Sequence, residues 1–328
     1  MSLIGNNHKG CRKWDFTMLK APLSFATVFL FLIGLASAYA DETLSYTWQG
    51  VTRTAIVHAP IKTLGHPAPL VIALYGSGDN AKGFQEAILF DRVADQEGFI
   101  VVYPDAIDGR WNYGRAPNGN MPLINNQPVD DIGFLRTMIS DLVERKLVDK
   151  KRIFATGFSR GGLMTFTLAC ALSDKIAAIA TIAGSMTEAQ MDDCKPTHLI
   201  PTMMINGTSD DSVFYDGHIW SSTRLVSIPE TLNYWRRQGG CSGQDKITAL
   251  PHLNKNDHTR ASLINWTGCK TGTGVRFYRI DNGGHSWPRL VDPNNPEPTH
   301  GQDFGGRNGD FETPVEIWNF FKQYQHLS

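Results

Sequence analysis

Apolar and helical patterns alternate along most of the chain. Mainly apolar runs predict strands at residues 70–75, 99–103, 153–156, 176–182, 201–205 and 275–280. Helical spacing predicts helices at residues 83–97, 131–146, 162–172, 229–238 and 315–324. The alternation of the two patterns predicts an α/β fold, with a mostly parallel sheet that carries helices on both faces.

The ends of several elements carry their own signals. Residues 43–57 alternate apolar and polar positions around Gln49 and Gly50, which predicts a hairpin at the edge of the sheet. Thr313 and Glu316 have the spacing of a capping box, so we expect the last helix to open there.

The first 40 residues have the pattern of an export signal. Basic residues precede an uncharged stretch at 21–35, and Ala38-Tyr39-Ala40 supplies a cleavage site before Asp41. The alternative is a membrane anchor, because the whole uncharged run, about 20 residues up to Ala40, is long enough to span a bilayer. The small-residue site favours cleavage, with Met1 or Met18 as the start. We therefore expect residues 1–40 to be a signal peptide and residues 41–328 to form a single catalytic domain, secreted or periplasmic, with no membrane association after cleavage.

Composition and charge are those of a globular protein, with 41% hydrophobic residues, 19% charged residues and a net charge of -1. This balance provides no basic surface for nucleic acid, and we expect no nucleic-acid partner. The sequence leaves the oligomeric state open.

Four of the five cysteines follow the predicted signal, an even number in an oxidising compartment. Four cysteines allow three pairings. We predict the two that close short loops, Cys170–Cys194 and Cys241–Cys269. Because none of the cysteines is spaced C-x-x-C, we expect no metal site.

One short motif between a strand and a helix suggests a catalytic nucleophile. Gly157, Ser159 and Gly161 form G-x-S-x-G, with an apolar strand before it and a small-residue helix after it. In a nucleophile elbow this turn holds the serine clear of the sheet. The alternative is a glycine-rich loop with a solvated serine, but the flanking strand and helix favour a catalytic Ser159.

A serine nucleophile needs a base, and the base needs an orienting carboxylate. Asp210 and His285 each follow a predicted strand in a glycine-containing loop, in the chain order of an α/β-hydrolase. The alternatives are that Asp210 or Asp211 merely forms a turn and that His285 is structural. We prefer Asp210 to Asp211 because it lies nearer the strand.

The oxyanion hole needs two backbone donors. We expect the N–H of Arg160 and one N–H from residues 76–78, with Ser77 as first choice. The Arg160 side chain could hold an acidic substrate group or form a surface salt bridge. Four aromatic residues either contact substrate or simply pack: Trp111, Tyr113, Tyr215 and Trp287.

Several segments together resemble those of secreted polyhydroxybutyrate depolymerase-type esterases, which are similar to feruloyl and acetylxylan esterases. These segments are ALYGSGDN, PDAIDGRWN, DDIGFL, GFSRGG, NGTSDDSVFY, YWRRQGGC and GGHSWP. The resemblance implies a triad of Ser159, Asp210 and His285. The chain departs from the family pattern at Tyr75, Arg160 and Arg289, which affects the choice of substrate more than the chemistry.

We therefore expect a serine carboxylic-ester hydrolase that needs no cofactor. Two alternatives are a serine peptidase of the same fold and a non-catalytic binding protein on a hydrolase scaffold. The sequence does not choose among hydroxyalkanoate oligomers, feruloyl esters and acetylated xylan. Because we find no second module after His285, we expect soluble esters to react faster than insoluble polymer, and the loop 288–311 to form one wall of the site.

Overall fold

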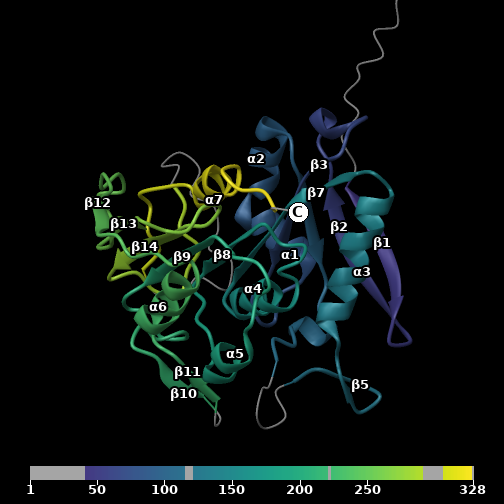
Figure 1. Cartoon of the computed structure of the whole chain (residues 1–328), viewed down its shortest axis with the longest axis horizontal. Helices are drawn as coiled ribbons and strands as arrows, with labels where there is room; N and C mark the ends of the chain where they lie inside the picture. Colours follow the sequence, from purple (N-terminus) through teal and green to yellow (C-terminus); the bar gives the residue numbers. More distant parts are fainter. Residues whose placement is uncertain (1–40, 115–120, 221–222, 291–305, 327–328) are drawn as a thin grey trace, which may run out of the picture. The chain divides into compact units, whose positions relative to one another are not determined.

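A ten-stranded sheet forms the centre of the protein in this computed structural model, which describes residues 41–114, 121–220, 223–290 and 306–326 (Figure 1). The strands are β1 (Glu42–Trp48), β2 (Val51–His58), β3 (Ala68–Leu74), β4 (Ile100–Pro104), β7 (Val148–Phe158), β8 (Ala178–Ile182), β9 (Thr202–Gly207), β12 (Asp245–Ala249), β13 (Arg260–Trp266) and β14 (Val275–Asp281). Their order is β1-β2-β4-β3-β7-β8-β9-β14-β13-β12. The neighbours from β4 to β14 are parallel and both edges are antiparallel, so the predicted mostly parallel sheet is confirmed.

Helices pack against both faces of this sheet. They are α1 (Ala81–Ile88), α2 (Phe90–Glu97), α3 (Asp131–Glu144), α4 (Arg160–Ala171), α5 (Glu188–Asp193), α6 (Ile228–Gln238) and α7 (Thr313–Phe321). On β7, the ring of Phe154 stacks on Phe321 of α7, whereas a Cβ at Gly157 would touch Thr165 of α4. Positions an odd number apart on a strand face opposite ways, so α7 and α4 cover opposite faces.

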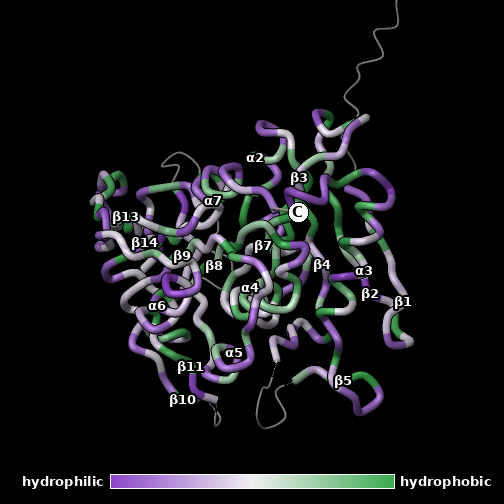
Figure 2. The backbone as a smooth tube through the Cα atoms, viewed as in Figure 1, coloured by the Kyte–Doolittle hydropathy of each residue, from purple (hydrophilic) through white to green (hydrophobic). Residues whose placement is uncertain are grey.

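The central strands supply most of the core. Every residue of β3, β4 and β8 is buried, and hydrophobic stretches run through the middle strands in Figure 2. By contrast, all five residues of β12 are exposed. An exposed edge strand needs no apolar run, which is why the sequence pattern did not predict β12. The sequence analysis also missed β13, a mostly half-buried strand between β14 and β12.

Smaller elements complete the described chain. They are the hairpins β5–β6 (Leu123–Ile124, Gln127–Pro128) and β10–β11 (His218–Trp220, Thr223–Leu225), and two 3-10 turns, Ile61–Thr63 and Ile107–Gly109. The predicted hairpin at residues 43–57 is confirmed as β1 and β2, with Gln49 and Gly50 between them.

Two predicted helices differ from those observed. The helix expected over 83–97 is divided into α1 and α2, because Leu89 adopts a left-handed conformation with φ 54°. The capping-box prediction was wrong. The last helix begins at Thr313 with Glu312 as its N-cap, and the Thr313 hydroxyl donates to the carbonyl of Pro288 at 2.7 Å instead.

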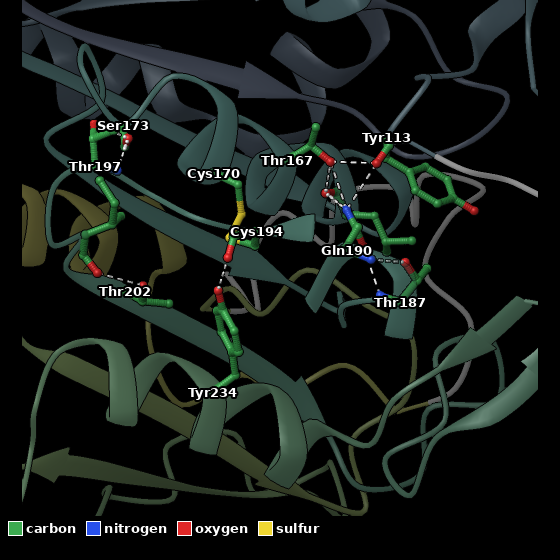
Figure 3. Close-up of a disulfide and its surroundings, with 12 residues drawn as sticks. Tyr113, Thr167, Cys170, Ser173, Thr187, Gln190, Cys194, Thr197, Thr202 and Tyr234 are labelled. Atoms are coloured by element: carbon green, nitrogen blue, oxygen red, sulfur yellow. Dashed lines mark hydrogen bonds between the residues drawn. A yellow bond between two sulfur atoms is a disulfide. The ribbon is translucent and has the colours of Figure 1, made fainter. Parts of the chain in front are cut away.

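Both predicted disulfides are present, Cys170–Cys194 and Cys241–Cys269. The first ties α4 to the end of α5, where the Tyr234 hydroxyl also donates to the Cys194 carbonyl at 2.9 Å (Figure 3). Disulfides are typical of proteins in oxidising compartments. In the described part of the chain, no helix is long and apolar enough to cross a membrane. The predicted signal peptide lies outside the described residues.

A buried histidine joins the start of the described chain to α2. His58 is 8% exposed, its Nδ1 lies 3.0 Å from Asp41 Oδ1 and 3.7 Å from Asp91 Oδ2, and its Nε2 lies 3.0 Å from Asp95 Oδ1. Burial by itself lowers the pKa of His58, but the three carboxylates outweigh it and raise the pKa above its ordinary value. The folded state therefore favours the imidazolium form.

This arrangement predicts that His58 stabilises the protein most at low pH. A raised folded-state pKa gives stability that is complete below the unfolded value near pH 6.5 and is lost as pH rises through the folded pKa. We expect His58→Gln to lower the free energy of unfolding by about 1.5–3 kcal/mol at about pH 6, the loss expected for charge-assisted hydrogen bonds, and by less at about pH 9. Urea unfolding at both pH values measures this, with His66→Gln at an exposed histidine as the control. An equal loss at both pH values would contradict a charged His58.

Candidate active site

Ser159 lies in a strained turn between β7 and α4. Its backbone has φ 53° and ψ -120°, a conformation that non-glycine residues rarely adopt. The flanking glycines are required by close packing, because a Cβ at Gly157 would lie 2.2 Å from the carbonyl oxygen of Gly161, and one at Gly161 would lie 2.1 Å from that of Leu74. This is the geometry of a nucleophile elbow.

An aspartate and a histidine meet beside this turn. The Nδ1 of His285 lies 2.8 Å from Asp210 Oδ2 and 3.0 Å from Oδ1, and both residues are 4% exposed. The N–H groups of Ser212 and Val213 donate to Asp210 Oδ1 at 2.9 and 2.7 Å, which orients the carboxylate. This carboxylate can therefore hold the Nδ1–H tautomer of His285 and leave Nε2 as the basic nitrogen.

Close backbone packing brings the two loops together. The strands β9 and β14 are parallel neighbours, so the loops at their carboxyl ends lie at one edge of the sheet. A Cβ at Gly207 would lie 2.1 Å from the carbonyl oxygen of Gly283, and the Ser209 N–H donates to that carbonyl at 2.9 Å. Asp210 and His285 are thereby placed by contacts between residues far apart in sequence.

Ser159 and His285 line one cavity of about 420 Å³. Among the described hydrogen bonds, none joins Ser159 Oγ to His285. Hydrogen bonds between a nucleophile and its base often form only when substrate binds. Asp211 also lines the cavity, but it is exposed and its carboxylate accepts the Ser212 hydroxyl at 3.4 Å.

The remaining wall of the cavity is largely apolar and includes residues that the sequence analysis missed. These are Leu163, Val213, Phe214, His218 and Leu225. His218 and Leu225 pair across the hairpin β10–β11, and the ring of His218 lies 4.7 Å from that of Phe214. Burial lowers the pKa of His218, although Asp210 opposes the shift, so this imidazole is neutral at pH 7. Val213 and Phe214 lie within the NGTSDDSVFY segment, whereas no quoted segment contains Leu163, His218 or Leu225.

The two residues expected to supply the oxyanion hole also lie at the cavity. Ser77 and Arg160 both line it, and Arg160 opens α4, where the first N–H groups have no intrahelical acceptor. The N–H of Gly78 donates to the carbonyl of Gly109 at 2.9 Å. Arg160 is only 6% exposed, so its side chain is buried and does not lie on the surface of the helix, where the sequence analysis considered a salt bridge.

Three predicted substrate-binding aromatics lie outside the lining of this cavity. Trp111 is fully buried and its Nε1 donates to the Tyr75 carbonyl at 3.0 Å. Trp287 packs on Phe84, with ring centroids 5.7 Å apart. The Arg279 guanidinium lies over the ring of Tyr215, 6.0 Å from the ring centroid. These three rings pack against neighbouring side chains and do not line this cavity, so their contact with substrate stays a prediction.

Tyr113 is the aromatic residue of the predicted set that lines the cavity. Burial raises the pKa of its hydroxyl, with Arg160 opposing, so the phenol is neutral at pH 7. Most of the loop 288–311, the expected wall of the site, lies outside the described residues.

One group of potential metal ligands occurs among the described residues, and it lies away from the cavity. Asp41, His58 and Asp91 have ligand atoms within 4.8 Å of one another. These groups already bond to one another or to Gln85, so their arrangement is explained without a metal.

The strand order, the elbow at Ser159 and the acid–histidine pair at neighbouring strand ends define an α/β-hydrolase. The chain belongs to the phospholipase/carboxylesterase family, whose model matches residues 57–227, just over half of its length.

Curated relatives include several esterases. The chain is 29% identical to feruloyl esterase B of Piromyces equi over 246 residues, which are 71% of this chain and 42% of that protein. It is 27% identical to the putative esterase NocK of Nocardia uniformis subsp. tsuyamanensis, over 75% of this chain and 74% of the relative. It is 28% identical to poly(3-hydroxyalkanoate) depolymerase C of Paucimonas lemoignei, over 51% of this chain and 40% of the relative. The chain thus spans less than half of the feruloyl esterase. These relatives confirm the predicted resemblance to depolymerase-type and feruloyl esterases.

Solved structures share the fold. An acetyl xylan esterase from Aspergillus awamori superposes with a TM-score of 0.54 at 14% identity, covering 74% of this chain and 94% of that one. A thermostable esterase superposes with a TM-score of 0.53 at 14% identity, over 87% of this chain and 63% of that one. At this identity the likeness supports the fold alone.

Proposed function

We propose that this protein is an exported serine esterase that hydrolyses carboxylic esters through Ser159, His285 and Asp210. The observation that carries the proposal is the buried contact between His285 Nδ1 and Asp210 Oδ2, 2.8 Å long, beside the cavity that Ser159 lines. A carboxylate so placed orients the imidazole and stabilises its cation. Family membership and the two disulfides support the ester chemistry and the export.

The reaction would proceed in two halves. Ser159 Oγ attacks the ester carbonyl carbon while its proton passes to His285 Nε2, and backbone N–H groups of Arg160 and Ser77 hold the oxyanion. The intermediate then collapses, the ester C–O bond breaks and His285 returns the proton to the leaving alcohol. Water attacks the acyl-enzyme with His285 as base, and collapse releases the acid and restores the Ser159 hydroxyl.

The cavity wall supports a short or aromatic acyl group as the substrate class. Leu163, Val213, Phe214 and Leu225 give it apolar surface, and about 420 Å³ suits a compact group. The names of the relatives, which also include a bifunctional acetylxylan esterase/xylanase, point to feruloyl esters, acetylated xylan and hydroxyalkanoate esters.

A substrate panel tests this function. The panel consists of methyl ferulate, a soluble hydroxybutyrate trimer and acetylated xylan. We expect the protein to hydrolyse at least one of these esters faster than the matched amide. Ser159→Ala protein is the control for hydrolysis by a contaminant. Hydrolysis of the amide at the ester's rate would indicate a peptidase, and inactivity on every ester would indicate a binding protein.

A further inference from the structure

The segment 105–113, here called the tryptophan loop, packs against the end of β3 that precedes Ser77. The carbonyl of Gly109 accepts the Gly78 N–H at 2.9 Å, and Trp111 Nε1 donates to the Tyr75 carbonyl at 3.0 Å. The hydroxyl of Tyr75 accepts the Ala106 N–H at 2.7 Å. Three hydrogen bonds therefore hold the 75–78 segment to this loop.

The same loop also contacts the other side of the proposed oxyanion hole. The Arg160 Nε donates to the Trp111 carbonyl at 2.8 Å, and the Arg160 guanidinium lies 5.0 Å from the ring centroid of Tyr113. The tryptophan loop thus contacts both chain segments that would supply the oxyanion donors. Their spacing depends on where this loop lies.

A buried ion pair anchors both ends of the loop. Arg53 Nη2 lies 2.6 Å from Asp131 Oδ1 and donates to the Asp105 carbonyl at 2.9 Å, at the start of the loop. Asp131 Oδ2 accepts the Asn112 N–H at 2.7 Å, near its end. Arg53 and Asp131 are each 1% exposed. One carboxylate oxygen of Asp131 therefore bonds to the loop, at Asn112, and the other bonds to Arg53.

Stability alone does not account for this pair. Replacing a buried ion pair by apolar residues of similar size is often neutral or stabilising, because the desolvation cost of two charges is large. Two apolar residues would fill the space but could accept no N–H from Asn112. The specific property of Asp131 is its second acceptor oxygen.

We propose that Asp131 is a positioning residue for the oxyanion hole, acting through the tryptophan loop on the backbone at Ser77 and Arg160. This inference rests on the proposed function of Ser159. It assigns a role to the second aspartate of the DDIGFL segment, which the triad chemistry leaves unused.

The first test is Asp131→Asn, with Asp130→Asn as the matched control. The amide leaves one acceptor oxygen and turns an NH₂ group toward a donor, so the loop should shift. We expect kcat to fall about 10- to 100-fold, the scale of a small misplacement, with KM changing less than about threefold. Asp130 is an exposed N-cap that accepts the Gly133 N–H at 2.8 Å, and asparagine caps as well, so its variant should match the parent protein.

Binding of a transition-state analogue separates positioning from general structural damage. An alkyl trifluoromethyl ketone forms a serine adduct that carries an oxyanion. Its inhibition constant should rise by the same factor as kcat falls, about 10- to 100-fold, because both depend on the oxyanion donors. Unchanged kcat and unchanged inhibition in Asp131→Asn would overturn the proposal.

Two further variants address the risk that Asp131→Asn folds poorly. The double change Arg53→Met, Asp131→Leu removes both charges, so it should restore stability in urea while kcat stays low; recovery of kcat would refute a positioning role. Trp111→Phe keeps the ion pair and removes the bond to the Tyr75 carbonyl, together with part of the buried ring that packs on Tyr75. It should lower kcat and weaken inhibitor binding together. A kcat and an inhibition constant equal to those of the parent protein would refute the role of the loop.

The outcomes also distinguish this inference from the proposed function. If Ser159→Ala retains activity, the proposed function itself fails. If Ser159→Ala is inactive but Asp131→Asn behaves like Asp130→Asn, only the positioning role fails.

Discussion

Replacing Ser159 by alanine should remove nearly all ester hydrolysis, lowering kcat by a factor on the order of 10⁶. The change removes the only atom that could form the acyl-enzyme in the proposed reaction. Alanine is smaller than serine and fits the same turn, so circular dichroism and urea unfolding should be close to those of the parent. The measurement is turnover of a p-nitrophenyl ester, with the acyl-enzyme followed by mass spectrometry.

Two neighbouring serines provide controls for this result. Ser212 and Ser77 also line the cavity, but neither hydroxyl has a chemical role in the proposal. Ser212→Ala should keep most activity. Ser77→Ala should do the same, because it keeps the backbone N–H assigned to the oxyanion hole. Covalent labelling of Ser159→Ala by a serine-directed phosphonate, or a larger loss in Ser212→Ala, would show that another residue is the nucleophile.

Asp210→Asn should lower kcat by roughly 10⁴ with little effect on KM. The carboxylate accepts the Nδ1–H of His285 at 2.8 Å, and an asparagine amide can turn its NH₂ group toward Nδ1 instead. His285 would then carry its proton on Nε2, where it cannot accept one from Ser159.

Asp211→Asn is the matched control, since Asp211 is adjacent, lines the same cavity and is exposed. We expect it to stay within about threefold of the parent in kcat, as for a surface carboxylate that bonds only locally. A larger loss in Asp211→Asn than in Asp210→Asn would mean that the acid has been assigned to the wrong residue.

The sequence by itself predicted what depends on local pattern and strand order. Gly157, Ser159 and Gly161 stand between an apolar strand and a helix, and this context favoured a nucleophile elbow over a glycine-rich loop. Asp210 and His285 each follow a strand, and parallel strands end at one edge of the sheet. The cysteine pairs were predicted as the two short loops, and both are present.

The tertiary structure alone decided which side chains meet around the cavity. Within NGTSDDSVFY, the apolar lining residues are Val213 and Phe214, and the predicted Tyr215 is not in the lining. Trp111, predicted to contact substrate, is fully buried, and its Nε1 joins the tryptophan loop to the Tyr75 carbonyl. Periodicity shows which face of an element is apolar, but not which distant segment covers that face.

The helix cap at Thr313 and the ion pair of Arg53 with Asp131 also depend on contacts that the sequence pattern does not show. Thr313 has the spacing of a cap, yet its hydroxyl bonds to Pro288, a residue 25 positions earlier. Arg53 and Asp131 are 78 positions apart in sequence, and neither is marked by its neighbours as half of a buried ion pair. A hydrogen bond between distant segments depends on the fold that joins them, and a pattern of nearby residues contains no information about it.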